Sequence, residues 1–250
     1  MKKDPVLLTA RRLAAEPLDG ATRLSAHAVT LRSVLVTFDL FSALIDSRMG
    51  ASAVLDGLAH ARGWPVDGGT LYDVWDARNK ASQRDLPTWV PFAEHCRRAL
   101  ADAYAELDLP GHADEDVAVL LRSVADWPRW PDVAEGLPAL AARHRVGILS
   151  NVDDEVFART LVAPLVADDA VLTSERLRAY KPGPEIYRRA RDRAGGQLVH
   201  VATSSRDVRG ALEAGIDVIH LRRPGHAVDP AGPVPDRSAA DLAEVGRLLG

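Results

Sequence analysis

The second half of the chain alternates between short apolar runs and stretches whose apolar residues recur at helical spacing. Four of the apolar runs predict β-strands: RVGILSN, AVLTSE, LVHVATS and DVIHLRR. Helical stretches follow them, and the last, SAADLAEVGRLLG, closes the chain. Strands that alternate with helices are typical of an α/β fold with a doubly wound parallel sheet.

One more apolar run, residues 34–38, predicts a buried strand much earlier, and Asp39 ends it. Between this strand and RVGILSN the pattern is helical only, as where Phe92, Cys96 and Leu100 fall on one face. We therefore expect a core domain of residues 33–46 and 128–250 and an inserted helical cap domain of residues 47–127. Residues 1–32 show no clean period and are expected to form an N-terminal extension.

Polar residues stand where the predicted strands end: Asp39, Ser150 with Asn151, Ser174 with Glu175, and Thr203 with Ser204. Doubly wound sheets bind ligands at the carboxyl ends of their strands. These side chains are therefore expected to converge on one site beneath the cap. Ser150 and Asn151 precede a helix and could form an anion site there, although simple N-capping would also explain them. Asp153 and Asp154 are expected to be surface acids that complement the helix dipole.

Composition narrows the class of protein. The chain of 250 residues is 47% apolar, carries a formal net charge of -4 and has no basic block, so nucleic acid is not an expected partner. No apolar run approaches the length of about 18 residues that spans a bilayer, and the first residues lack a signal-peptide core. Cys96 is the only cysteine, which excludes an intramolecular disulfide and a cysteine-rich metal site. A cytoplasmic location is expected, and a homodimer is compatible with the sequence.

Four motifs occur in a fixed order: VTFDLFSALID, VGILSNVDDE, LRAYKPGPEIY and VHVATSSRDVRGALEAGI. Together they resemble the haloacid dehalogenase (HAD) superfamily of hydrolases, from residue 34 to the C-terminus. The resemblance implies a Rossmann-like HAD core with an inserted cap. It also implies that Asp39 is a nucleophile forming a covalent ester, and that Lys181 and Asp207 belong to the same catalytic site. The chain has only four lysines, so the lysine in AYKPGP is itself notable.

Phe41 indicates which branch of the superfamily the chain resembles. Phosphatases of the superfamily carry a second Asp at this position, and it protonates the leaving oxygen. In 2-haloacid dehalogenases the position is aromatic and no metal is required. A halide leaves as an anion and needs no proton, so an aromatic residue that lines an apolar pocket suits this chemistry. No cofactor and a small anionic substrate are therefore expected.

The same resemblance implies further substrate-binding residues. Tyr187 matches a tyrosine of the dehalogenase branch, although a core position would also explain it. A cap arginine grips the leaving halide in that branch, and Arg78, or secondarily Arg84, is the candidate for it here. The complete set of candidate substrate-binding residues is Phe41, Arg78, Ser150, Asn151, Tyr187, Thr203 and Ser204.

Several positions depart from the dehalogenase pattern, so two alternatives stay open. Ala43 stands in place of a threonine, and Ala202 and Ser204 stand in place of a serine and an asparagine. One alternative is a Mg²⁺-dependent phosphatase, with Asp39, the Phe41 carbonyl and Asp207 as ligands and Asp46 or a cap residue as the acid. The other is a catalytically degenerate HAD domain that binds an anion or a protein partner.

Overall fold

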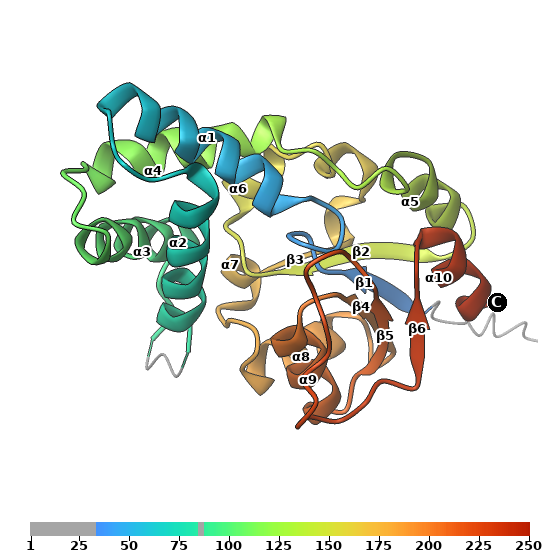
Figure 1. Ribbon diagram of the computed structural model, residues 1–250. Coiled ribbons are helices and arrows are strands. Elements are labelled where there is room, and N and C mark those ends of the chain that lie inside the picture. The colour runs from blue at the N-terminus through green and yellow to red at the C-terminus, as the bar shows by residue number, and fades with distance from the viewer. Residues whose placement is uncertain (1–33, 85–87) are drawn as a thin grey trace, which may run out of the picture. The chain divides into compact units, whose positions relative to one another are not determined.

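The computed structural model describes residues 34–84 and 88–250, and these belong to one compact unit (Figure 1). The N-terminal extension predicted for residues 1–32 lies outside the described residues. Within the described ranges, no helix is both long and apolar enough to cross a membrane.

A parallel sheet forms the centre of the unit, in the strand order β3-β2-β1-β4-β5-β6. Its strands are β1 (Leu35–Phe38), β2 (Arg145–Ser150), β3 (Val171–Thr173), β4 (Leu198–Ala202), β5 (Asp217–Leu221) and β6 (Arg237–Ala239). The predicted doubly wound α/β fold is confirmed. The strand order reverses beside β1, so the carboxyl ends of β1, β2 and β4 meet at the point where such sheets bind ligands.

The sixth strand was not predicted. The sequence pattern indicated a helix from residue 238 onward, but residues 237–239 pair with β5 at the edge of the sheet. The closing helix α10 (Leu242–Leu249) begins only after Asp241, whose carboxylate accepts a hydrogen bond of 2.7 Å from Glu244 N. This N-cap sets the start of the helix and leaves the preceding residues extended.

Helices cover both faces of the sheet because alternate residues of each strand point to opposite sides. On one side Val36, Phe38 and Ile148 pack with α5 (Val133–Ala141), α6 (Asp154–Ala158) and α10. On the other side Leu35 and Leu149 pack with α7 (Ser174–Leu177), α8 (Pro184–Arg193) and α9 (Ser205–Glu213). Two 3₁₀ turns, η2 (Ala163–Leu165) and η3 (Asp168–Ala170), connect α6 to β3.

The predicted helical insertion lies between β1 and β2. It consists of α1 (Ser47–Arg62), α2 (Gly68–Ser82), α3 (Phe92–Glu106), α4 (Ala113–Arg122) and the 3₁₀ turn η1 (Ser123–Asp126) (Figure 1). Aspartates begin the first two helices: Asp46 accepts from Met49 N at 2.9 Å, and Asp67 accepts from Thr70 N at 2.8 Å. We call this insertion the cap. Its treatment as a separate domain, with the boundaries given above, stays a prediction.

Hydrogen bonds join the cap to the sheet region. The Asp153 carboxylate, just after β2, accepts from Phe92 N at 2.8 Å and Ala93 N at 2.9 Å. The Tyr180 hydroxyl donates to the Val90 carbonyl at 2.7 Å. Asp153 was expected to be a surface acid at its own helix; instead it caps α3 of the insertion, whose N-cap residue, Pro91, offers no side-chain acceptor.

Candidate active site

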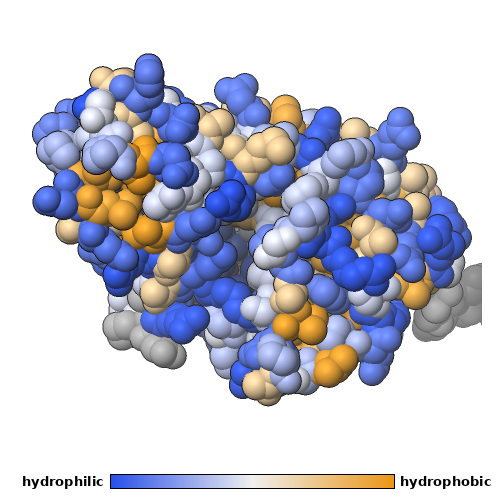
Figure 2. Space-filling view, in the orientation of Figure 1, coloured by the Kyte–Doolittle hydropathy of each residue, from blue (hydrophilic) through white to orange (hydrophobic). Residues whose placement is uncertain are grey.

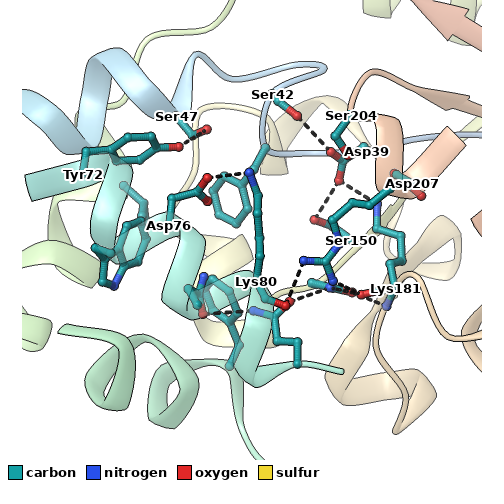
Figure 3. A pocket seen from close by; sticks show the side chains of 18 of the residues that line it. Asp39, Ser42, Ser47, Tyr72, Asp76, Lys80, Ser150, Lys181, Ser204 and Asp207 are labelled. Carbon is teal, nitrogen blue, oxygen red and sulfur yellow. Dashed lines mark hydrogen bonds and ion pairs between the residues drawn. The ribbon is translucent and has the colours of Figure 1, made fainter. Parts of the chain in front are cut away.

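A pocket lies where the cap meets the carboxyl end of the sheet (Figure 3). Asp39 follows β1, Ser150 ends β2, and Asp207 lies in the first turn of α9 after β4. Figure 2 shows this face of the molecule as mostly hydrophilic and hollowed between the cap helices and the sheet region. The strand order therefore brings together residues that lie more than a hundred positions apart in sequence.

Lys181 is the centre of a buried charge cluster. Its Nζ donates to Asp39 Oδ1 at 2.8 Å, to Asp207 Oδ2 at 2.6 Å and to the Leu149 carbonyl at 2.9 Å. The side chains of all three charged residues are at least nine-tenths buried. One cation therefore balances part of the charge of two carboxylates, which could not both lie unpaired in this environment.

The pKa values follow from this pairing. Burial disfavours the charged form of Lys181, but the charges of Asp207 and Asp39 outweigh burial and raise the pKa of Lys181 above its usual value. Burial likewise disfavours charged Asp207, yet Lys181 and His200 hold the pKa of Asp207 below its usual range. Lys181 is therefore an ammonium, and Asp207 a carboxylate, over the whole neutral pH range.

Two further residues, Tyr187 and His200, contact the Asp207 carboxylate. Tyr187 OH donates to Asp207 Oδ1 at 2.7 Å, and His200 Nε2 lies 3.1 Å from Asp207 Oδ2. The other ring nitrogen of His200 lies 3.0 Å from Thr37 Oγ1. Tyr187 is fully buried and does not line the pocket, so the expectation that it contacts substrate is not met. Sequence reasoning gave no histidine a role, and His200 is recognisable only once β1 and β4 are neighbours.

Asp39 has one oxygen more engaged than the other. Oδ1 accepts from Lys181 and, at 3.3 Å, from Ser150 Oγ. From the part of the chain that the structure describes, Oδ2 receives only a long contact of 3.4 Å from Ser42 Oγ. Oδ2 is thus the oxygen with the greater freedom to attack a substrate. Ser42 was not among the predicted site residues.

Asn151 was expected to bind substrate, but its amide is used within the protein. Nδ2 donates to Gln83 Oε1 of the cap at 2.8 Å and to the Lys181 carbonyl at 2.9 Å. Its Oδ1 accepts from Lys181 N at 2.8 Å. Asn151 lines the pocket, yet these bonds show that it fixes the backbone of Lys181 and ties it to the cap.

The remaining strand ends converge only in part. Ser204 lines the pocket, whereas Thr203 is fully buried and donates to the Leu221 carbonyl at 2.9 Å. Ser174 is also buried, and its hydroxyl bonds to the backbone of Val152. The substrate-binding role predicted for Thr203 is therefore corrected: its hydroxyl holds neighbouring strand ends together.

The cap arginines lie outside the pocket, contrary to the prediction. The Arg78 guanidinium forms an exposed ion pair with Glu106, and Arg84 is exposed as well. Asp76 and Lys80 of α2 line the pocket instead and pair at 2.5 Å (Figure 3). Residues four apart share a helix face and residues two apart do not, which is why Arg78 points elsewhere.

Aromatic residues form an apolar wall beside the charge cluster. The Phe41 ring stacks on Phe92 with centroids 6.0 Å apart, and it packs against Trp127 at 5.7 Å. Phe41 follows β1, whereas Phe92 and Trp127 belong to the cap, so the wall is built from both parts of the chain. Phe41 carries no titratable group, and Asp46, considered above as an alternative acid, does not line the pocket.

The carboxylates do not fit a Mg²⁺ site in this arrangement. Both oxygens of Asp207 face Lys181, Tyr187 or His200, and Asp39 Oδ1 also faces Lys181. Across residues 34–84 and 88–250, no group of three or more His, Cys, Asp or Glu side chains is placed to hold a metal ion. The cation between the two aspartates is the ammonium of Lys181.

Comparisons with known proteins agree with the fold and identify the family. The family model described as haloacid dehalogenase-like hydrolase matches residues 34–215. The fold resembles that of L-2-haloacid dehalogenase from Xanthobacter autotrophicus, with a TM-score of 0.74 at 22% identity, covering 87% of this chain and 98% of that one. The chain belongs to the haloacid dehalogenase-like hydrolase family.

Two curated relatives are similar in sequence. The chain is 33% identical over 113 residues to (S)-2-haloacid dehalogenase 4A of Burkholderia cepacia, a match that covers 43% of this chain and about half (49%) of that protein. It is 26% identical over 228 residues to haloacetate dehalogenase H-2 of Moraxella sp. (strain B), covering 86% of this chain and 96% of that protein.

Proposed function

We propose that this chain releases halide from small 2-haloacids through a covalent ester on Asp39, without a metal ion. The observation that carries this proposal is the pairing of Asp39 with Lys181 beside Phe41, a residue that cannot donate a proton to a leaving group. The names of the two curated relatives support the same substrate class.

In the first step, Asp39 Oδ2 attacks the carbon that bears the halogen. A carbon–oxygen bond forms, the carbon–halogen bond breaks, and the halide leaves with the bonding electron pair. The Phe41–Phe92–Trp127 wall excludes water from the attacking carboxylate. Lys181 holds Asp39 Oδ1 and so turns Oδ2 toward the substrate.

In the second step, water attacks the carboxyl carbon of the Asp39 ester. The hydroxy acid leaves, a proton is released to solvent, and one oxygen of the water stays on Asp39. Asp207 is not proposed as the base, because Lys181 and His200 hold its pKa low. Its proposed role is to orient Lys181, whose charge then stabilises the oxyanion that develops at Asp39.

A paired assay tests the proposal. Halide release from 2-chloropropionate and fluoroacetate is measured with EDTA or with Mg²⁺, with Asp39→Asn as the blank, beside a panel of phosphate esters. Release of halide that persists in EDTA is the expected result. In a single turnover in heavy-oxygen water, the product should carry ordinary oxygen, because that atom comes from Asp39. Phosphate release that needs Mg²⁺, or turnover of no substrate by the folded protein, would overturn the proposal.

A further inference from the structure

Three cationic side chains of the described residues line the pocket, and two of them are already paired with carboxylates. Lys181 lies between Asp39 and Asp207, and Lys80 pairs with Asp76 at 2.5 Å. The third is Arg206, which immediately precedes Asp207 in α9. Among the residues that the structure describes, no carboxylate forms an ion pair with Arg206.

Within residues 34–84 and 88–250, Arg206 is held by neutral acceptors alone. Its Nη1 donates to the Lys80 carbonyl at 3.0 Å, and its Nη2 donates to the Lys181 carbonyl at 2.6 Å. A guanidinium has more N–H donors than these two bonds use, so donors remain for a ligand. The two carbonyls come from the cap and from the loop before α8, and they fix the orientation of the guanidinium before any ligand arrives.

The electrostatics agree with an unbalanced cation. Burial and the charge of Arg84 lower the pKa of Arg206, and the charges of Asp207 and Asp76 oppose this without offsetting it. A paired arginine such as Arg97 instead has its pKa raised by Glu94. A partly buried cation without a counter-ion is costly unless an anion completes it. The nucleophile cluster cannot attract an anion, because Asp39 and Asp207 outnumber Lys181.

We propose that Arg206 binds the carboxylate of the substrate and makes the pocket selective for 2-substituted acids over their neutral counterparts. The inference rests on the proposed function and adds the residue that recognises the acid group. A guanidinium fork matches the two oxygens of a planar carboxylate better than it matches a single halide. The carboxylate then lies against α9, which leaves the substituted carbon facing Asp39.

The test combines kinetics with equilibrium binding. Arg206→Gln removes the charge and keeps a polar side chain. We expect KM for 2-chloropropionate to rise about 10-fold to 100-fold, the range for a lost hydrogen bond to a charged group, while kcat changes much less. The rise should be equal for 2-bromopropionate. By calorimetry, Arg206→Gln should weaken lactate binding by a similar factor and leave the weak binding of lactamide unchanged.

Tyr180→Phe is the matched control for a purely structural role. It removes another hydrogen bond between cap and core, to the Val90 carbonyl, and Tyr180 does not line the pocket. If Tyr180→Phe raises KM as much as Arg206→Gln does, or if lactate and lactamide lose affinity equally, Arg206 is only a link between cap and core. An effect on kcat that differs between chloride and bromide would instead assign Arg206 to the leaving group and overturn the proposal.

The two proposals can fail separately. If the wild-type protein turns over no haloacid but binds lactate through Arg206, the proposed function fails and the carboxylate site stands. If haloacids are turned over with an unchanged KM in Arg206→Gln, the proposed function stands and the carboxylate site fails.

Discussion

Ser42 holds its hydroxyl 3.4 Å from the Asp39 carboxylate, and it does so with its own backbone in the left-handed region, at a φ of 71°. The Trp130 indole donates to the Ser42 carbonyl at 2.9 Å, and Ser42 N donates to the Ile45 carbonyl at 3.0 Å, so the turn is fixed on both sides. A non-glycine residue in this region is strained. The resemblance described above implies a threonine at the next position, where this chain has Ala43. The serine therefore brings back, from the neighbouring position, a hydroxyl beside the nucleophile.

Ser42→Gly separates strain from function. Glycine adopts a positive φ without steric cost, so the free energy of unfolding should stay the same or rise by about 1 kcal/mol. Halide release should fall several-fold, because Asp39 Oδ2 loses its only side-chain donor among the described residues. Urea denaturation and initial rates measure the two effects. A variant that is both less stable and fully active would contradict this account of Ser42.

Lys181→Met should destabilise the protein by about 3–5 kcal/mol at neutral pH, because Asp39 and Asp207 are left buried without their cation. In the native protein the pKa of Asp207 is lowered and that of Lys181 is raised. The pairing therefore contributes its full stability at any pH above the pKa of unfolded Asp and below the pKa of unfolded Lys. The contribution of Asp207 is lost as pH falls through its folded pKa, and that of Lys181 is lost as pH rises through its folded pKa.

In Lys181→Met, the free energy of unfolding should depend on acid pH in the opposite direction from the native protein. Without Lys181 the buried carboxylates bind protons more tightly when folded than when unfolded, so the stability of Lys181→Met should fall as pH rises from about 4 to 7. Urea denaturation across this range measures the trend. Lys80→Met is the control: it breaks the partly exposed pair with Asp76 and should cost less than about 1 kcal/mol. Equal losses in the two variants would contradict a special role for the buried cluster.

Chelation should leave halide release unchanged. A divalent ion between Asp39 and Asp207 would have to displace the Lys181 ammonium and compete with Tyr187 and His200 for Asp207. Added Mg²⁺ should therefore neither activate the enzyme nor raise its melting temperature, whereas a ligand of the folded state would raise it. Loss of activity in EDTA that Mg²⁺ restores would show that these carboxylates rearrange around a metal.

The central strands and the place of Asp39 were predictable, because apolar runs that end in polar residues mark the carboxyl edge of a parallel sheet. Lys181 and Asp207 were predicted to share this site only through the resemblance of the four motifs to the HAD superfamily. The edge strand β6 was not, because its three residues, Arg237–Ala239, show no apolar run. The core position considered for Tyr187 is the one that the structure shows. The contacts of Tyr187 and His200 with Asp207 were not predicted, since they depend on how α8 and β4 pack.

The cap residues that line the pocket could not be predicted from the sequence, for a different reason. Choosing Arg78 relied on the position of an arginine in a related pattern, although the cap spacing differs. The helical rotation of α2 determines which of its side chains reach the pocket. Asp76 and Lys80 share the face that lines it, and Arg78 lies on another face and pairs with Glu106. Lys80 is one of the chain's four lysines, so the scarcity that drew attention to Lys181 applied to it equally. Arg206 lay within the fourth motif, next to Asp207, but its meaning depends on which carboxylates are already paired.

Asp153→Ala should couple a loss of stability to a loss of activity. The carboxylate caps α3 through Phe92 N and Ala93 N, and Phe92 stacks on Phe41 in the pocket wall. Losing an N-cap costs about 0.5–2 kcal/mol, and the amide hydrogens of the first turn of α3 should exchange faster. Halide release should fall as well, because the wall beside Asp39 loosens. Asp67→Ala is the matched control, since it removes the exposed N-cap of α2, which bonds to Thr70 within the cap. Asp67→Ala should lose similar stability with little change in turnover. Equal losses of turnover in the two variants would show that Asp153 stabilises the cap in general and has no particular effect on the pocket wall.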